Sequence, residues 1–513
     1  MTAVGGQKEA FQLSTETYPR AVGTGEAAES SLSSRRGIAI LALLCLVQFM
    51  DILDASILNI ALPSIKRDLG FTQQSLQWVI NGYILTYGGL LLLGGRAADL
   101  LGRRRMLITG LFVFAGASLV GGLAQSESLL VAARFVQGAG AAMLSPAALS
   151  SLTTIFRTDS DRHKALGAWA AVSGLAGAAG VLFGGVLTES LSWRWVLFVN
   201  IPFSAVALVG ALLLLEGGER IKRLVDVDLR GALLVTGGML LLVYTVVKAP
   251  DVGWGTWRTV AGLAGALVLL AAFVVNELRV RNPLIPMSIL RVKGVAVADT
   301  TLMVVAAGFY PMFFFLTLYM QTVLHYSPIQ AGVAYLPLTA AIIVIASFSP
   351  RLLARFGTKP VVVLGAVVGA GGMYMLSRIP ADGSYVTDIL PGMVVAAFGL
   401  GGLFVGTTTA ANAGVGEDKA GLAAGLVNTG QQLGGALGLA ILAAIATAHT
   451  TSLVDGGEGL AQASTAGFQW GLLGGAGFVL AAAFVALLAP NSRDTVVAEA
   501  PEAPEGEAVA HAA

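Results

Sequence analysis

Long apolar runs separated by short polar connections make up most of the chain. Fourteen of these runs are long enough to cross about 30 Å of hydrocarbon as a helix. Their predicted cores are 37–62, 76–95, 106–125, 128–151, 165–187, 195–215, 231–247, 260–275, 295–320, 331–350, 361–377, 389–411, 421–446 and 468–488. The pattern predicts an all-α membrane protein with 14 transmembrane helices.

Composition supports this prediction and excludes several classes of protein. Of the 513 residues, 56% are hydrophobic and 12% are charged, against about 25% charged in an ordinary soluble domain. The net charge of +1 gives no reason to expect a nucleic-acid partner. One cysteine, Cys45, and four scattered histidines form no disulfide framework and no metal cluster. We therefore expect no metal and no cofactor.

The two ends of the chain differ from the rest. Residues 1–36 are polar and rich in Ser, Thr, Gly and Glu, and residues 490–513 are rich in Ala, Glu and Pro, so both are predicted to be disordered tails. The first apolar run is not a signal peptide, because no cleavage site follows a short apolar core. It is expected to remain as the first membrane helix.

Basic residues predict the orientation of the helices. With both termini on one side, 24 of the 31 Lys and Arg lie on that side, six lie on the other, and Arg134 lies within a helix. The three arginines at 103–105 are decisive, since each would cost about 2.5–3.5 kcal/mol at the bilayer centre. The chain is therefore expected to be a multi-pass protein of the cell membrane with both termini in the cytoplasm.

A faint internal repeat divides the chain. The spacing of glycine and basic residues at 95–105 recurs at 350–360. We infer two related six-helix halves, 37–215 and 295–489, joined by 216–294, which holds a cytoplasmic loop and two inserted helices.

Five segments carry a resemblance to a known family. Residues 95–105 read Gly-Arg-Ala-Ala-Asp-Leu-Leu-Gly-Arg-Arg-Arg, and residues 53–63, 130–140, 193–202 and 420–435 hold further motifs in the same order. Together they resemble the major facilitator superfamily, specifically its fourteen-helix drug:proton antiporter branch. The resemblance covers about 37–488. It implies the major facilitator fold, a small-molecule substrate, protons, a lipid environment and a monomeric working unit.

The family's export motif in the fifth helix is present with changes. The residues at its positions are Gly167, Ala176, Gly180, Val181, Gly184 and Gly185. Small residues would still permit close packing, but Val181 replaces the proline that would bend the helix. Antiport is therefore less firmly indicated than family membership.

Few charges lie within the predicted membrane helices, and these are candidates for function. Asp51 and Asp54 are one helical turn apart, and Asp54 and Arg134 lie roughly 12 Å and roughly 9 Å from the same membrane surface, at 1.5 Å per residue. We predict that Arg134 faces the acids and that a change in their protonation couples transport to the proton gradient. The alternative is a static ion pair joining two helices.

The loop at 95–105 is a second candidate site. By resemblance, Gly95, Asp99, Gly102 and Arg103 form a conformational latch, in which Asp99 contacts Arg103 and a neighbouring helix end in the outward-open state. The alternative is that this loop only fixes topology, which would explain its arginines but not its Gly-Asp-Gly spacing.

Polar side chains within the helices are candidates for the substrate path. The residues are Asn81, Tyr83, Gln137, Tyr310, Asn428 and Gln431. Packing between helices is an alternative role for each of them, because membrane helices use such groups to hydrogen-bond one another.

The predicted function is proton-coupled efflux of small amphiphilic drugs, antibiotics or metabolites by alternating access. No phosphate-binding Gly-x-x-x-x-Gly-Lys-Ser/Thr motif is present, which favours an ion gradient as the energy source. One alternative is a proton-coupled uptake symporter of the same fold. Another is a membrane sensor or enzyme, although no nucleophile triad indicates catalysis.

Overall fold

A computed structural model of the chain describes residues 31–156, 158–216, 228–280, 283–285, 289, 292, 294–412 and 420–491. The predicted disordered tails, 1–36 and 490–513, lie outside the described residues except for 31–36 and 490–491. Within the described part the chain is helical, without strands. Fourteen spans in this part are long and apolar enough to cross a membrane, which confirms the predicted fold class.

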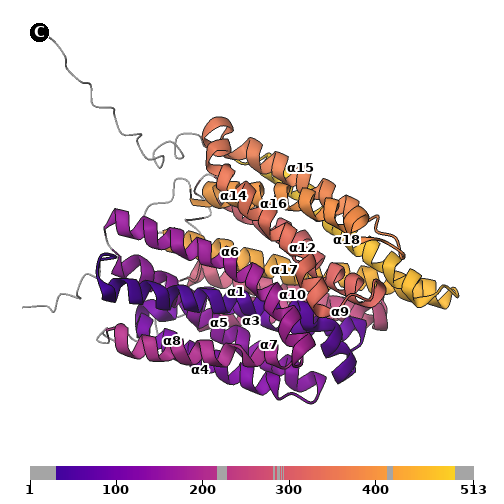
Figure 1. Cartoon of the computed structure of the whole chain (residues 1–513), viewed down its shortest axis with the longest axis horizontal. Coiled ribbons are helices and arrows are strands. Elements are labelled where there is room, and N and C mark those ends of the chain that lie inside the picture. Colours follow the sequence, from indigo (N-terminus) through magenta and orange to yellow (C-terminus); the bar gives the residue numbers. More distant parts are fainter. Residues whose placement is uncertain are drawn as a thin grey trace, which may run out of the picture.

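The first half of the fold (Figure 1) contains eight helical segments. They are α1 (Arg35–Leu69), α2 (Gln73–Leu76), α3 (Trp78–Leu101), α4 (Arg103–Gly122), α5 (Glu127–Ile155), α6 (Asp159–Ser190), α7 (Trp195–Phe198) and α8 (Asn200–Leu214). Helices α9 (Leu229–Val252) and α10 (Trp257–Arg279) follow and pack on each other. Helix α9 also contacts α3 and α17, so this pair lies beside the seam between the halves.

The second half of the fold is also made of helical segments. It contains α12 (Val295–Leu318), η2 (Tyr319–Val323), α13 (Pro328–Ala334), α14 (Leu336–Phe356), α15 (Thr358–Leu376), η3 (Tyr385–Ile389), α16 (Leu390–Asn412), α17 (Ala420–Asp455) and α18 (Leu460–Ala486). We call the end of the bundle where α1 begins the Arg35 end, and the end where α1 stops the Leu69 end. In Figure 1 the two halves converge toward the Leu69 end and diverge toward the Arg35 end.

The predicted loop at 95–105 is almost entirely helical. Helix α3 continues to Leu101 and α4 begins at Arg103, so Gly102 alone makes the turn, with φ of 99°. Gly357 makes the same one-residue turn between α14 and α15, with φ of 82°. A side chain at either position would be strained at these angles. The sequence repeat therefore corresponds to a shared backbone turn.

Helix α1 is longer than hydropathy indicates. The predicted core ends at 62, which leaves Lys66 and Arg67 outside the helix, whereas both lie in the last turn of α1. Gly70 ends the helix with φ of 78°, and its N–H donates to the Lys66 carbonyl. Cations at a helix C-terminus are favoured by the helix dipole, which explains why these charges continue the helix instead of ending it.

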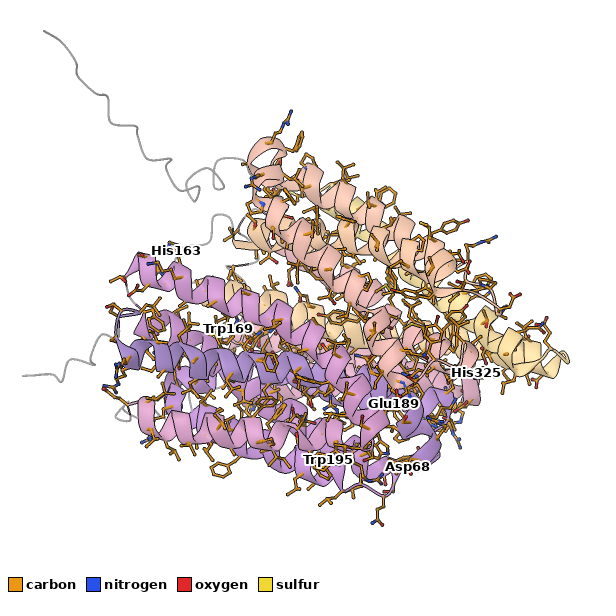
Figure 2. The ribbon with its side chains drawn as sticks, viewed as in Figure 1. Asp68, His163, Trp169, Glu189, Trp195 and His325 are labelled. Atoms are coloured by element: carbon orange, nitrogen blue, oxygen red, sulfur yellow. The ribbon has the colours of Figure 1, made fainter. Side chains whose placement is uncertain are left out.

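Direct contacts join the halves at the Leu69 end. The Gln321 amide donates to the Ile60 carbonyl at 2.9 Å, and the Ile329 N–H donates to the Glu189 carboxylate at 3.0 Å. Gly332 of α13 lies against the backbone of Val181 in α6, where an added Cβ would be 2.4 Å from the Val181 oxygen. Figure 2 shows Glu189 and His325 together at this end and His163 at the opposite one. The seam is therefore closed at the Leu69 end.

A bulky residue in this seam is expected to open it. A Cβ at Gly185 would lie 2.7 Å from the Pro328 carbonyl oxygen across the two halves. We predict that Gly185→Val raises thiol labelling of a buried Ile60→Cys reporter several-fold, in a background where Cys45 is replaced by serine. Gly177→Val is the matched control on the same helix, because no atom lies within 4 Å of its Cβ position. Equal labelling in both variants would contradict the conclusion that these contacts close the seam at the Leu69 end.

Candidate functional site

Asp54 lies at the centre of a buried polar network within the first half. Its Oδ2 accepts from Arg134 at 2.7 Å, and its Oδ1 accepts from Gln137 at 2.8 Å and from Asn200 at 2.6 Å. Asp54 is 0% exposed and Arg134 is 2% exposed. The Gln137 amide also donates to Ser118 at 2.8 Å. Four helices, α1, α4, α5 and α8, therefore contribute side chains to a single carboxylate site.

Arg134 is held on several sides at once. Besides Asp54, it donates from Nε to the Val79 carbonyl at 3.0 Å and from Nη1 to the Gln137 side-chain oxygen at 2.6 Å. Its guanidinium carbon lies 4.4 Å from the centre of the Tyr83 ring, a cation–π contact. A lysine has no planar group that could reproduce these contacts. These contacts hold the guanidinium in position beside Asp54.

Asp51 forms a second network, one turn along α1. Its Oδ1 accepts from the Tyr83 hydroxyl at 2.5 Å and its Oδ2 accepts from the Tyr87 hydroxyl at 3.1 Å. Tyr87 in turn accepts from the Asn428 amide of α17 at 3.4 Å. Because α17 belongs to the second half, Asp51 is connected to the seam between the halves while Asp54 is enclosed within one of them.

Glycine allows α5 to approach α3 closely at this site. A Cβ on Gly138 would lie 2.3 Å from the Tyr83 carbonyl oxygen and 2.3 Å from the Thr86 hydroxyl. Real Cβ contacts are never so short, so a side chain here would push the two helices apart. Gly138, next to Gln137, is therefore a packing residue. The close approach of α5 to α3 that it permits brings Arg134 within reach of the Val79 carbonyl.

The glycines of the fifth-helix motif have different surroundings. Gly180 and Gly184 pack on α1, where added Cβ atoms would lie 2.6 Å from Ser56 and 2.7 Å from the Ile57 carbonyl oxygen, and Gly185 packs on α13. Gly167 has no atom within 4 Å of its Cβ position. Helix α6 runs without a break from Asp159 to Ser190, consistent with valine instead of proline at 181.

The latch residues lie at the Arg35 end. Arg103 lies 3.9 Å from the half-exposed Asp99 carboxylate and donates to the Ser150 hydroxyl at 2.6 Å. Gly102 makes the turn, whereas Gly95 is helical and faces Pro146 of α5. The structure brings Asp99 and Arg103 together, and the latch itself stays a prediction.

The six predicted substrate-path residues divide into three groups. Gln137 and Tyr83 belong to the two acid networks, and Asn81 is fully buried with neither side-chain polar atom bonded. Asn428, Gln431 and Tyr310 are partly exposed. Tyr310 packs on α17, where an added Cβ at Gly435 would meet its ring at 2.2 Å. The path through the protein stays a prediction for all six.

A cavity of about 640 Å³ lies away from these networks, at the Leu69 end of the seam. Lys66, Arg67, Phe71 and His325 are among its lining residues. The cavity belongs to the closed end of the seam and contains neither of the acids that the sequence singled out.

Sequence reasoning missed three members of the networks. Asn200 and Ser118 contact the Asp54 site and Tyr87 contacts Asp51. Asn200 lies within the motif at 193–202, which supplied a signal for its importance but not for its partner. Ser118 and Tyr87 carry no such signal, since isolated hydroxyl groups in membrane helices are common.

Comparisons with known proteins find relatives over most of the chain. Residues 44–439 match the family profile described as Major Facilitator Superfamily. The puromycin resistance protein of Streptomyces alboniger is 42% identical over 423 residues, covering 81% of this chain and 83% of that protein. The cephamycin export protein of Amycolatopsis lactamdurans is 42% identical over 417 residues, covering 80% of this chain and 85% of that protein.

Solved structures show the same fold at low sequence identity. An auto-inhibited peptide transporter of the POT family matches with a TM-score of 0.65 at 14% identity, covering 88% of this chain and 96% of that one. A bacterial homologue of the human lysosomal transporter Spinster, in an inward-facing conformation, matches with a TM-score of 0.62 at 16% identity, covering 88% and 96%.

Proposed function

Because this chain belongs to the major facilitator superfamily and is a multi-pass membrane transporter rather than an enzyme, we propose that it exports small amphiphilic compounds, antibiotics among them, in exchange for protons. The two halves would alternate between conformations open to opposite sides of the cell membrane. The working unit in this proposal is a single chain.

The buried Asp54–Arg134 pair carries the proposal of proton coupling. Removing two charges from water is costly, and a buried pair is stable only while both charges and their hydrogen bonds are present. A proton on Asp54 would cancel the carboxylate charge and leave the guanidinium without its counter-ion. Such a change alters packing among α1, α4, α5 and α8 and so favours a different arrangement of the halves.

The sidedness of transport follows from the predicted orientation. With the arginines at 103–105 in the cytoplasm, the Arg35 end faces inward and the Leu69 end faces outward. The closed seam at the Leu69 end then corresponds to a conformation open toward the cytoplasm, from which an exporter would load its substrate.

The relatives indicate which class of substrate to test. Their names refer to puromycin, cephamycin, lincomycin and tetracenomycin C, which supports an antibiotic as the exported compound. We propose puromycin as the first probe, since the alignment with the puromycin resistance protein covers most of both chains.

Transport in proteoliposomes would test the proposal. An antiporter moves the drug toward the acidic compartment while protons leave it, so labelled puromycin should accumulate in an acidic lumen and a lumenal dye should report faster proton loss when drug is added. Protein-free liposomes correct for passive trapping. Drug movement with protons toward the alkaline side would indicate a symporter, and no drug-dependent proton movement would indicate a sensor.

The latch gives a further prediction. Asp99→Ala should lower transport by up to about fivefold while puromycin binding is retained, because losing a partly exposed charge pair costs about 1 kcal/mol or less of conformational bias. Glu216→Ala is the matched control, since Glu216 is a similarly exposed acid that lies 2.9 Å from Arg36 at the same end. An equal loss in both variants, or normal transport by Asp99→Ala, would assign the Asp99 loop a topological role only.

A further inference from the structure

Two buried carboxylates meet where the inserted helices join the rest of the fold. Asp228 precedes the first residue of α9, and Glu277 lies in the last turn of α10. Asp228 is 6% exposed and Glu277 is 3% exposed. A Cβ built on Gly231 would lie 2.5 Å from Asp228 Oδ2 and 2.8 Å from Glu277 Oε1, so the two oxygens border the same point in space.

The surroundings provide donors for every carboxylate oxygen but one. The Gly231 N–H donates to Asp228 Oδ1 at 2.8 Å, the Asn276 amide donates to Asp228 Oδ2 at 2.5 Å, and the Ile285 N–H donates to Glu277 Oε2 at 2.8 Å. Glu277 Oε1 is buried and has no hydrogen-bond partner among the residues that the structure describes. It faces Asp228 Oδ2, which is also an acceptor, so the pair lacks one donor.

Within the described residues, the basic side chains next to the two acids in the sequence do not compensate the pair. Arg230 of α9 and Arg279 of α10 are exposed, and neither forms an ion pair with the two acids in the described part of the chain. On the side of α17, the cluster that packs beside Ile285 contains Ala423 and Leu426, which carry no charge. Two ionised carboxylates in such a site repel each other, and the second ionisation is strongly disfavoured.

We propose that Asp228 and Glu277 form a proton-binding site in which one proton on Glu277 Oε1 is donated to Asp228 Oδ2. The proton supplies the missing donor and removes one negative charge. A metal cation fits less well, because Ca²⁺ and similar ions require several oxygen ligands, typically six or more for Ca²⁺. Two carboxylate oxygens border the point beside Gly231, and among the described residues no third His, Cys, Asp or Glu joins them in a group that could hold a metal. This site is separate from Asp54 and does not depend on the proposed transport mechanism.

The proton would stabilise the contact between the inserted helices and the second half. Glu277 holds the Ile285 N–H, and Ile285 packs against the cluster that includes Ala423 and Leu426 of α17. Loss of the proton would leave two facing carboxylates and weaken the contact between Glu277 and the Ile285 N–H. Since the folded protein then holds a proton that the unfolded chain releases at neutral pH, its stability should fall as pH rises.

Infrared spectroscopy and thermal unfolding of the full-length protein in lipid nanodiscs would test this proposal. At neutral pH the wild-type minus Glu277→Gln difference spectrum should contain a protonated carboxylic acid band that disappears at alkaline pH. Glu277→Gln, whose amide can donate permanently to Asp228, should unfold at a temperature that no longer falls over that pH range. Asp251→Asn is the control on α9, because Asp251 is exposed beside Lys248 at 3.6 Å.

Two further variants keep the test decisive. Gly231→Ala retains both acids but places a methyl group between them, so it should also lose the band; if Glu277→Gln does not fold, this variant carries the comparison. Asp54→Asn should retain the band, which separates this site from the transport site. Absence of the band in wild type would overturn the proposal, and so would stabilisation by sodium that Glu277→Gln abolishes, since that result would indicate a cation site.

Discussion

Replacement of Asp54 by asparagine is expected to abolish proton-driven accumulation of drug while leaving folded, inserted protein. Asparagine has nearly the same shape and can still accept from Arg134, but it cannot release or take up a proton. A proton moved through 100 mV supplies about 2.3 kcal/mol, enough to sustain roughly a fiftyfold drug gradient. In proteoliposomes with an imposed pH gradient, Asp54→Asn should sustain no gradient above that of protein-free liposomes.

The matched control for this variant is Asp68→Asn. Asp68 lies on the same helix but is half-exposed, and it accepts from Arg194 at 2.5 Å at the Leu69 end. It should retain most of the wild-type gradient. Exchange of labelled for unlabelled puromycin across the membrane should persist in Asp54→Asn, because exchange needs no proton. A normal gradient in Asp54→Asn would restrict Asp54 to a static role, and loss of exchange as well would point to general damage.

Removal of the guanidinium is expected to cost more stability than any other single change considered for this site. Arg134→Met leaves Asp54 buried without its cation, and breaking a buried pair in this way costs about 3–5 kcal/mol. It also removes the donor to the Val79 carbonyl. Thermal unfolding in nanodiscs should show a large decrease in the melting temperature.

A double variant separates the charge effect from the packing effect. Adding Asp54→Asn to Arg134→Met removes the uncompensated carboxylate, so part of the lost stability should return, and the coupling energy measures the interaction between the two side chains. Strictly additive losses would mean that the ion pair contributes nothing beyond packing. Recovery of stability without recovery of the drug gradient is the outcome expected if Asp54 carries the coupling proton.

The inserted helices show where local sequence patterns are insufficient. Hydropathy predicts cores at 231–247 and 260–275 for these two helices. Asp228 and Glu277 then fall in the connecting segments, where acids are common. In the structure α10 continues to Arg279, and this extension places Glu277 next to Gly231 at the start of α9. Nothing in either segment alone indicates that two acids 49 positions apart meet in a buried site.

The sequence by itself determined the membrane helices, their order and the approximate depth of the charges within them. These properties depend on hydrophobicity summed along a helix and on the fixed rise per residue, both of which are local. It also placed the turn at Gly102 within a recognisable loop, although it overestimated the length of that loop.

Only the tertiary structure decided which side chains meet. The depths of Asp54 and Arg134 favoured their contact, but the participation of Asn200, the separate connection of Asp51 to α17 and the isolation of Gly167 depend on how each helix is rotated and tilted against its neighbours. A rotation of one residue, about 100° in a helix with 3.6 residues per turn, would direct Asp54 elsewhere without changing the hydropathy of α1. That rotation is fixed by close packing at small residues such as Gly138 and Gly184, which act between segments distant in the chain.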